Sequence, residues 1–293
     1  MRIATWNVNS LKARLEKVTW WLERVKPDVL LMQETKLADA DSPVEVFKGA
    51  GYELVHHGEG RWNGVAIASR CGLKNVVTNF GEPLRPAKTH DVADDVADDE
   101  PMAEARMISA ECDGVRVVCI YAPNGRVVDS PFYEAKLIWF GRLRRWLDEA
   151  VEKNTAIALG GDFNVAPEDV DVWDPNACHG GTHVSERERQ AFARLCEWGL
   201  VDAYRLRHPE PGRYTWWDYR AGNFYKNMGM RIDHLLVGVA LQPRVVWADI
   251  DREARKGKPT PSDHAPLVID LDEPGFAFDS GWVSAEARIA KRR

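Results

Sequence analysis

A carboxylate and a carboxamide stand two residues apart where an apolar segment of the chain ends. The segment, residues 154–159, has the length of a strand, and Gly160-Gly161 separate it from Asp162 and Asn164. In an extended chain, residues two apart point to the same side. Asp162 and Asn164 are therefore expected to project together, with Phe163 turned into the core. Such a pair suits a hard divalent cation or a water oriented for attack, whereas the simpler alternative is a turn without function.

Polar side chains also follow other strand-like segments or turns, in both halves of the chain. They are Asn7, Glu34, Tyr121 with Asn124, and Asp263 with His264, preceded by Asp233. Each alone has an ordinary structural explanation, such as a helix cap for Asn7 or a solvated carboxylate for Glu34. Tyr121 and His264 would also fit in a hydrogen-bonded core, and Asp263 would fit in a turn. Their combined order favours one site that draws on both halves of the chain.

These residues must be positioned by many short strands and a few longer amphipathic helices. Strand-like segments are residues 1–8, 29–32, 52–56, 64–69, 73–78, 106–111, 115–121, 154–159, 214–219, 230–237, 244–250 and 267–271, and helical ones are 11–25, 43–49, 131–151 and 185–198. A capping-box pattern opens the last helix at Ser185, and residues 171–183 read as an irregular loop. This pattern predicts an α/β fold of two sheets packed face to face, with helices outside. We expect one domain over residues 1–271 and a tail, 272–293, without an assigned role.

The charge, the cysteine pattern and the apolar runs of the sequence limit the classes of protein to which it can belong. The net charge of −6 argues against a protein that coats nucleic acid nonspecifically, but it does not exclude an enzyme with a local basic groove. An acidic loop insertion at about 89–104 holds much of the negative charge. The five cysteines are scattered without a C-x-x-C pair, which favours reduced thiols. Met1 leads directly into a strand and no apolar run has membrane-spanning length, so we expect a cytoplasmic protein with no membrane partner.

The order of the motifs closely resembles the exonuclease III family of apurinic/apyrimidinic (AP) endonucleases, within the endonuclease/exonuclease/phosphatase superfamily. The matching segments are residues 3–9, 31–36, 62–66, 121–125, 160–166, 231–233 and 262–266. Several of these motifs occur across the superfamily, whereas the segments at 33–36, 121–125 and 216–220 point more narrowly to DNA repair enzymes. The resemblance spans about residues 1–271. It implies a DNase I-like, four-layer α/β sandwich of two mixed sheets flanked by helices.

The resemblance also implies a metal site. Its candidate ligands are Asn7, Glu34, Asp162, Asn164, Asp263 and His264, and the expected cofactor is Mg²⁺, for which Mn²⁺ would substitute. A phosphodiester repels nucleophiles, so its cleavage needs a cation, a positioned water and donors for the developing charge. Whether one metal or two act stays open at this stage.

The same resemblance assigns catalytic roles. Asp162 would orient and deprotonate the attacking water, and Asn164 would fix that water and the phosphate. His264 would donate to a phosphate oxygen while Asp233 accepts from its other ring nitrogen. Tyr121 would also contact the phosphate. The choice between Tyr121 and Asp162 as the group that activates the nucleophile stays open.

Substrate contacts are expected from loop residues. Trp216, Met230 and Ile232 match positions that wall the pocket for an extruded abasic sugar in the family, although Trp216 and Ile232 also fit as ordinary strand core. Met230 is smaller than the tryptophan of some relatives, which leaves the tightness of the pocket open. Asn124 would contact the phosphate, and Arg126 would reach DNA or remain solvated.

The function implied is that of a DNA repair nuclease. It would hydrolyse the phosphodiester 5′ to abasic sites in duplex DNA, with 3′-to-5′ exonuclease and 3′-phosphatase or phosphodiesterase activity. Its partner would be duplex DNA with abasic sites or 3′ ends, and we expect a monomer. One alternative is a superfamily phosphoesterase that acts on RNA ends or on phosphoinositide or phospholipid head groups. A DNA-binding module with an inactive site is another, which the complete set of polar residues disfavours.

Overall fold

The structure is a computed structural model that describes residues 1–81 and 104–290. Its strands are β1 (Arg2–Asn7), β2 (Val29–Gln33), β3 (Glu53–His57), β4 (Val65–Ser69), β5 (Lys74–Thr78), β6 (Met107–Cys112), β7 (Val115–Tyr121), β8 (Ile157–Asp162), β9 (Val201–Asp202), β10 (Asp233–Val237), β11 (Val245–Ile250) and β12 (Leu267–Leu271). Its helices are α1 (Leu11–Val25), α2 (Val44–Gly49), α3 (Pro131–Ala150), α4 (Pro175–Cys178), α5 (Glu186–Glu197), α6 (Asn223–Lys226) and α7 (Trp282–Ala290). Short 3₁₀ turns are η1 (Asp39–Asp41), η2 (Asp169–Asp171), η3 (Arg220–Gly222), η4 (Gln242–Arg244) and η5 (Arg252–Arg255).

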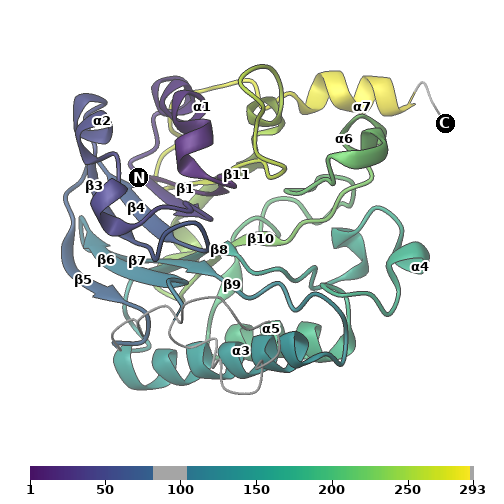
Figure 1. The fold of residues 1–293 in the computed structure, drawn as a ribbon, viewed down its shortest axis with the longest axis horizontal. Coiled ribbons are helices and arrows are strands. Elements are labelled where there is room, and N and C mark those ends of the chain that lie inside the picture. The colour runs from purple at the N-terminus through teal and green to yellow at the C-terminus, as the bar shows by residue number, and fades with distance from the viewer. Residues whose placement is uncertain (82–103, 291–293) are drawn as a thin grey trace.

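The described strands form two mixed sheets of six strands each (Figure 1). The first sheet has the order β11-β12-β1-β2-β4-β3, and the second has the order β5-β6-β7-β8-β10-β9. Within them β1 runs parallel to β2 and β7 runs parallel to β8, whereas the other pairs are antiparallel. Each sheet therefore has one parallel pair whose carboxyl ends meet at the same edge.

A buried apolar core lies between the two sheets. Ile3 and Leu31 contribute to it from the first sheet, and Val117 and Leu235 contribute from the second. Side chains of both sheets crowd Gly160, where an added Cβ would lie 2.5 Å from Leu235 Cδ2 and 2.8 Å from Leu31 Cδ1. Only glycine fits at this position without moving those side chains, so Gly160 lets β8 lie against the opposite sheet.

Helices cover the outer faces of both sheets. Trp21 of α1 packs against the first sheet, and Trp139 of α3 and Phe192 of α5 pack against the second. In Figure 1, α3 and α5 run together beneath the second sheet, and α1 and α2 lie on the opposite side of the molecule. The predicted four-layer α/β sandwich is thus confirmed. The predicted capping box is also present, because the side chains of Ser185 and Glu188 each accept from the other's backbone N–H.

One predicted strand does not form. Residues 214–219 were expected to be extended, yet the structure gives only isolated bridges at Trp216. The segment divides its hydrogen bonds between two different neighbours: Trp216 N donates to Met230 O (2.9 Å) and Trp217 N donates to Asp263 O (3.1 Å). A regular ladder needs one partner strand along its whole length. The aromatic residues at 214–219 therefore indicate a buried segment and not a regular strand.

The predicted loop, the tail and the acidic insertion remain to be placed in the fold. The loop expected at 171–183 contains the short helix α4, and the tail at 272–293 contains α7, whose Trp282 Nε1 donates to Ile250 O at 2.6 Å. The acidic insertion at 89–104 lies outside the described residues except for Glu104. None of the helices in the described part of the chain combines the length and apolar character needed to cross a membrane.

The strand ends bring polar residues from distant parts of the chain to one edge of the sandwich. Asp162 ends β8, and its register partners are Tyr121, the last residue of β7, and Asp233, the first residue of β10. Asn7 ends β1, which faces β8 across the core, and Gln33 ends the neighbouring β2. The last residues of the two parallel strand pairs therefore lie at the same edge of the sandwich.

Lys136 of α3 and Glu188 of α5 form an ion pair in which both side chains are fully buried. Burial alone would raise the pKa of Glu188, but Lys136 and the Ser185 hydroxyl hold it below its usual range. We predict that Lys136→Met lowers the free energy of unfolding by about 3–5 kcal/mol at pH 7, because it leaves a buried carboxylate without its cation. Urea denaturation would measure this loss. The loss should shrink toward pH 5, since a protonated Glu188 costs less to bury.

The matched control for this prediction is Arg187→Met. Arg187 and Glu134 form a bidentate pair between the same two helices, but both side chains are about half exposed. Water screens such a pair, so the urea midpoint should move much less than in Lys136→Met. Equal shifts in the two variants would contradict the importance of the buried pair.

Candidate active site

Asn7 links carboxylates that come from the two different sheets. Its Nδ2 donates to Glu34 Oε1 at 2.8 Å and to Asp162 Oδ2 at 2.9 Å. Its Oδ1 accepts from Asn9 N at 3.0 Å, which fixes the orientation of the amide. Asn7 is fully buried, so it joins the end of β1 to the end of β8 across the sandwich.

Glu34 lies on a tight turn directly after β2. Its backbone adopts φ +52°, in the left-handed region. Its carboxylate pairs with Lys36 at 2.8 Å. Burial alone would raise the pKa of Glu34, but Lys36 and the amide of Asn7 lower it, so this carboxyl group is ionised at neutral pH.

Asp162 and Asn164 lie together, although not as extended chain. Asn164 has φ +51°, so the backbone turns after the buried Phe163, and Asn164 N donates to Asp162 Oδ1 at 2.8 Å. The expected extended geometry is wrong here because the chain leaves the sheet at Asp162. The Asn164 side chain accepts from Asn124 Nδ2 at 3.1 Å and donates to Ala122 O at 3.0 Å. This arrangement ties the turn to the end of β7.

His264 is held between two carboxylates. Its Nδ1 lies 2.8 Å from Asp233 Oδ2, and its Nε2 lies 3.9 Å from Asp162 Oδ2. Burial alone would lower the pKa of His264, but Asp233 and Asp162 raise it to about 10. The ring is therefore positively charged at neutral pH, with an N–H on each side. Asp233 Oδ1 is buried and has no hydrogen-bond partner among the described residues.

Carboxylate oxygens of Glu34 and Asp162 and a ring nitrogen of His264 all lie within 4.8 Å of one another. Two buried or half-buried carboxylates at this spacing, with an orphaned oxygen of Asp233 nearby, fit a hard divalent cation. Asp263 lies beside this group, where its Oδ1 accepts from Asn9 Nδ2 (2.9 Å) and its Oδ2 accepts from Trp216 Nε1 (3.1 Å). Both oxygens of Asp263 are thus engaged by protein donors.

Tyr121 stands beside the same carboxylates. Burial and the neighbouring Glu34 raise the pKa of its hydroxyl well above the usual value, and Arg106 only partly offsets them. The Arg106 guanidinium lies 4.8 Å from the centroid of the Tyr121 ring. The hydroxyl therefore stays protonated at neutral pH and can act only as a hydrogen-bond donor or acceptor.

The three residues expected to wall a pocket lie together. Trp216 and Met230 pair through reciprocal backbone hydrogen bonds of 2.9 Å, and both pack in one small apolar cluster with Ile232, which is buried. Asn124 and Arg126 are exposed on the turn after β7. The Arg126 guanidinium lies over the ring of Phe132, 3.7 Å from its centroid. All five remain candidates for substrate contact.

Other residues of this region were not assigned from the sequence. The Ser262 hydroxyl donates to Asn7 O at 2.7 Å and accepts from His264 N at 3.1 Å. The Thr215 hydroxyl accepts from the backbone N–H groups of Ile232 and Asp233, both at 3.1 Å. Ser262 stands in a recognised motif and could have been identified from it. Thr215 offers no comparable signal, because its partners are distant in sequence.

His183 is a third residue of the site that was not assigned from the sequence. Its Nδ1 lies 2.6 Å from Asn164 O, so the ring supports the backbone of the turn. Burial, reinforced by Lys136, lowers the pKa of His183 to about 4. The imidazole is therefore neutral under ordinary conditions, unlike that of His264.

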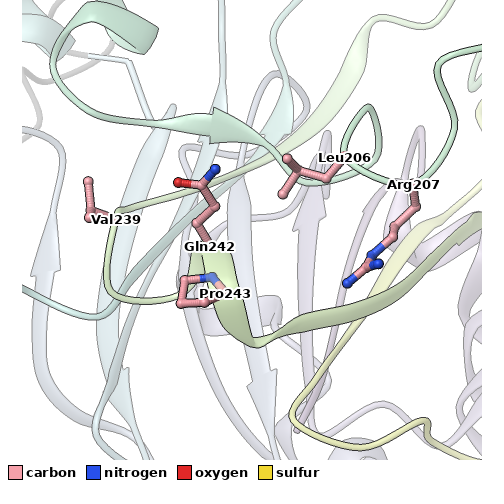
Figure 2. A pocket seen from close by; sticks show the side chains of 5 residues that line it. All are labelled: Leu206, Arg207, Val239, Gln242 and Pro243. Atoms are coloured by element: carbon pink, nitrogen blue, oxygen red, sulfur yellow. The ribbon is translucent and has the colours of Figure 1, made fainter.

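An open depression on the surface lies apart from these residues (Figure 2). It is lined by Leu206, Arg207, Val239, Gln242 and Pro243. In Figure 2 the side chains of Arg207 and Gln242 border it together with apolar groups. It shares no residue with the group of Glu34, Asp162 and His264, which we call the acidic cluster, and its lining has no titratable pair suited to catalysis.

Comparisons with known proteins agree with this geometry. The model of the Endonuclease/Exonuclease/phosphatase family matches residues 4–264. Exodeoxyribonuclease III of Haemophilus influenzae is 31% identical over 284 residues, which cover 92% of this chain and all of that protein. An AP endonuclease structure from Archaeoglobus fulgidus is 36% identical, with a TM-score of 0.84 over 93% of this chain and all of the other.

A structure from Neisseria, described as a 3′ phosphatase bound to a product DNA hairpin, is 38% identical. It superposes with a TM-score of 0.82 over 93% of this chain and 100% of its own. The family is metal-dependent, and the acidic cluster provides a site that suits a metal ion. From its fold, its site and these relatives, the chain belongs to the endonuclease/exonuclease/phosphatase family, as a hydrolytic DNA repair nuclease of the exodeoxyribonuclease III type.

Proposed function

We propose that the protein is a Mg²⁺-dependent nuclease that hydrolyses the phosphodiester 5′ to abasic sites in duplex DNA and also trims 3′ ends. Mn²⁺ would substitute for Mg²⁺. The observation that carries this proposal is the junction in which Asn7 holds Glu34 and Asp162 together, with the charged His264 beside them. A hard-ligand site next to a cationic hydrogen-bond donor suits an anionic phosphodiester. We propose that the enzyme acts as a monomer in the cytoplasm.

Glu34 and Asp162 are the residues that would hold the cation, with Asn7, Asn164, Asp263 and His264 around them. The cation would neutralise charge on phosphate oxygens. Its binding is favoured by the excess of carboxylates over cations at this edge of the sandwich. Lys36 pairs with Glu34 but does not contact Asp162, so it leaves the second carboxylate open for ligation or for proton transfer.

Asp162 is the better candidate for the base that activates water. Burial and the nearby Asp233 raise the pKa of Asp162 to about 7 in the metal-free protein. A bound cation would hold this carboxyl group in its ionised form, which is the form that can accept a proton. The Tyr121 hydroxyl has a pKa raised well above 10 and would stay protonated. We therefore assign proton abstraction to Asp162 and hydrogen bonding of the phosphate to Tyr121.

His264 would donate to a phosphate oxygen from Nε2 while Asp233 accepts from Nδ1. The short Nδ1 contact of 2.8 Å fixes the ring, and the raised pKa of His264 keeps it charged. A charged donor held in advance stabilises negative charge that develops in the transition state. Asn124 and Asn164 extend the same polar surface toward the exposed turn at Arg126.

The apolar cluster of Trp216, Met230 and Ile232 supports preference for a sugar without a base. An abasic nucleotide is small and is cheap to extrude from the duplex. Because Met230 and Trp216 are only half-buried, part of the cluster is available for contact. Relatives described as an AP endonuclease and as a 3′ phosphatase share this fold, which is consistent with more than one DNA substrate.

A direct assay tests the proposed substrates. One labelled duplex would carry a tetrahydrofuran abasic analogue, and a second intact duplex would carry a recessed 3′ end. We expect Mg²⁺-dependent incision 5′ to the analogue, slower shortening of the recessed end, and no cleavage in EDTA. Cleavage of the recessed end without incision would restrict the enzyme to 3′ ends. No cleavage of either DNA would contradict the proposal and direct the next assays to RNA ends and lipid phosphates.

Replacement of the proposed base gives a second test. Asp162→Asn should lower the single-turnover rate by about a thousandfold or more, because a carboxamide cannot accept the proton. DNA affinity, measured by fluorescence anisotropy, should change little. The control is Asp113→Asn, at an exposed turn with φ +47° where asparagine is well tolerated. A comparable loss of DNA affinity in Asp162→Asn would indicate a structural role instead.

Cation binding should release protons near neutral pH. With a pKa of about 7, Asp162 is about half protonated at pH 7, and a bound cation favours its ionised form. Calorimetric Mg²⁺ titrations in buffers of different ionisation enthalpy should thus report about half a proton released at pH 7, more at pH 6 and almost none at pH 8.5. Asp162→Asn should show no such release. Release that does not vary with pH would contradict the assignment.

A further inference from the structure

The turn that presents Glu34 has an unusual backbone. Glu34 and Lys36 both adopt left-handed conformations, with φ of +52° and +53°. Residues with a Cβ rarely occupy this region, so the surrounding structure must hold the turn in place. Part of that support is backbone pairing, because Thr35 N donates to Gly64 O (3.1 Å) and Lys36 N donates to Asn63 O (2.9 Å).

The Thr35 side chain makes a second, longer connection. Its Oγ1 lies 2.8 Å from His56 Nε2 on β3, and His56 Nδ1 lies 2.7 Å from Asp39 Oδ1. A carboxylate only accepts, so Nδ1 of His56 carries the proton and Nε2 must accept from the Thr35 hydroxyl. Asp39 Oδ1 also accepts from Gly58 N at 2.8 Å. We call this chain of Thr35, His56 and Asp39 the Thr35 relay.

Two glycines leave room for the Thr35 relay. A Cβ at Gly64 would lie 2.1 Å from Thr35 Oγ1, and a Cβ at Gly58 would lie 2.3 Å from His56 Cε1. Either added carbon would displace a hydrogen-bonding group of the relay. The close approach of the backbone on both sides therefore encloses Thr35 and His56, which are almost completely buried.

The residue types match those of a nucleophilic triad, but burial excludes that chemistry. The Thr35 hydroxyl has no access to a substrate, since Thr35 is fully buried. Burial also lowers the pKa of His56, although Asp39 opposes this, so the ring stays neutral. The relay therefore has the properties of a support rather than of a reaction centre.

We infer that the Thr35 relay positions Glu34 for the metal ion, so that Thr35, His56 and Asp39 act as positioning residues from the far side of the turn. The inference rests on the proposed function, because it assumes that Glu34 binds the cation. Thr35 is fixed on the side of the turn that faces β3, which leaves the neighbouring Glu34 carboxylate directed at Asn7. Loss of the hydroxyl would remove one of the restraints on this strained turn and let the Glu34 carboxylate shift from its position beside Asn7.

The test compares Thr35→Val, which keeps the shape and removes the hydroxyl, with Thr35→Ser, which keeps the hydroxyl. Mn²⁺ binding to the full chain would be measured directly by electron paramagnetic resonance, without DNA. We expect Thr35→Val to bind Mn²⁺ about 10–100-fold more weakly, which is the typical effect of losing a residue that supports a metal ligand from outside the site. Thr35→Ser should bind nearly as the natural chain does. Equal affinity of both variants and the natural chain would overturn the inference.

A second pair of variants avoids the core. Asp39 is 56% exposed, so Asp39→Ala should fold, and it should weaken Mn²⁺ binding in the same direction by removing the acceptor of His56. Asp41→Ala, in the same exposed turn, is the control and should leave Mn²⁺ affinity unchanged. Thermal melts would confirm folding. Unchanged affinity in Asp39→Ala would count against the relay, even if Thr35→Val failed to fold.

Mn²⁺ binding by the natural chain and by the variants distinguishes failure of the proposed metal site from failure of the Thr35 relay. If the natural chain bound no Mn²⁺, the proposed metal site itself would be wrong. If the natural chain bound Mn²⁺ and Thr35→Val bound it equally well, only the role of the Thr35 relay would be lost. In the activity assay, the variants should need more Mg²⁺ for half-maximal rate but should recover most of the natural rate at saturating Mg²⁺, which a general loss of structure would not produce.

Discussion

The junction at Asn7 is the interaction on which the rest of the site depends. Its two amide hydrogens hold two carboxylates from opposite sheets at 2.8 and 2.9 Å. Without such a shared donor, Glu34 and Asp162 would repel each other in a place that water screens poorly. Two residues before Asp162, Gly160 leaves room for Leu31 of the opposite sheet, so the two sheets pack closely near the junction. The packing of the two sheets and the position of the two carboxylates are therefore linked.

Charge around the junction is arranged asymmetrically. Lys36 pairs with Glu34 on one side, and His264 lies between Asp162 and Asp233 on the other. Lys36 keeps Glu34 ionised, and the two aspartates keep His264 charged. Burial and Asp233 raise the pKa of Asp162 to about 7, although His264 opposes this rise. Similar carboxyl groups therefore have different pKa values because their surroundings differ, and under the proposed function only Asp162 would also act as a base.

A second buried network supports the strand that carries Asp233. Arg231 is almost completely buried, and its guanidinium bonds Asp171 at 2.8 Å and Asp202 at 2.7 Å. It also donates to His234 Nδ1 at 2.9 Å, so His234 Nε2 carries the proton and donates to Val165 O at 2.9 Å. This network supports the end of the β8–β10 pairing at which Asp162 and Asp233 lie. The active site is therefore supported by ion pairs outside it as well as by the core.

The sequence by itself determined the sandwich and, through its resemblance to a known family, the candidate site residues. Periodicity placed most strands and long helices, the Ser185 capping box placed α5, and the order of motifs singled out Asp162 and His264. Tertiary structure alone decided that Asn7 bridges two sheets, that Asn164 turns left-handed, and that Thr35 reaches His56. The reason is physical: local patterns encode propensity and burial, whereas these contacts join residues far apart in the chain and exist only once the sheets have packed.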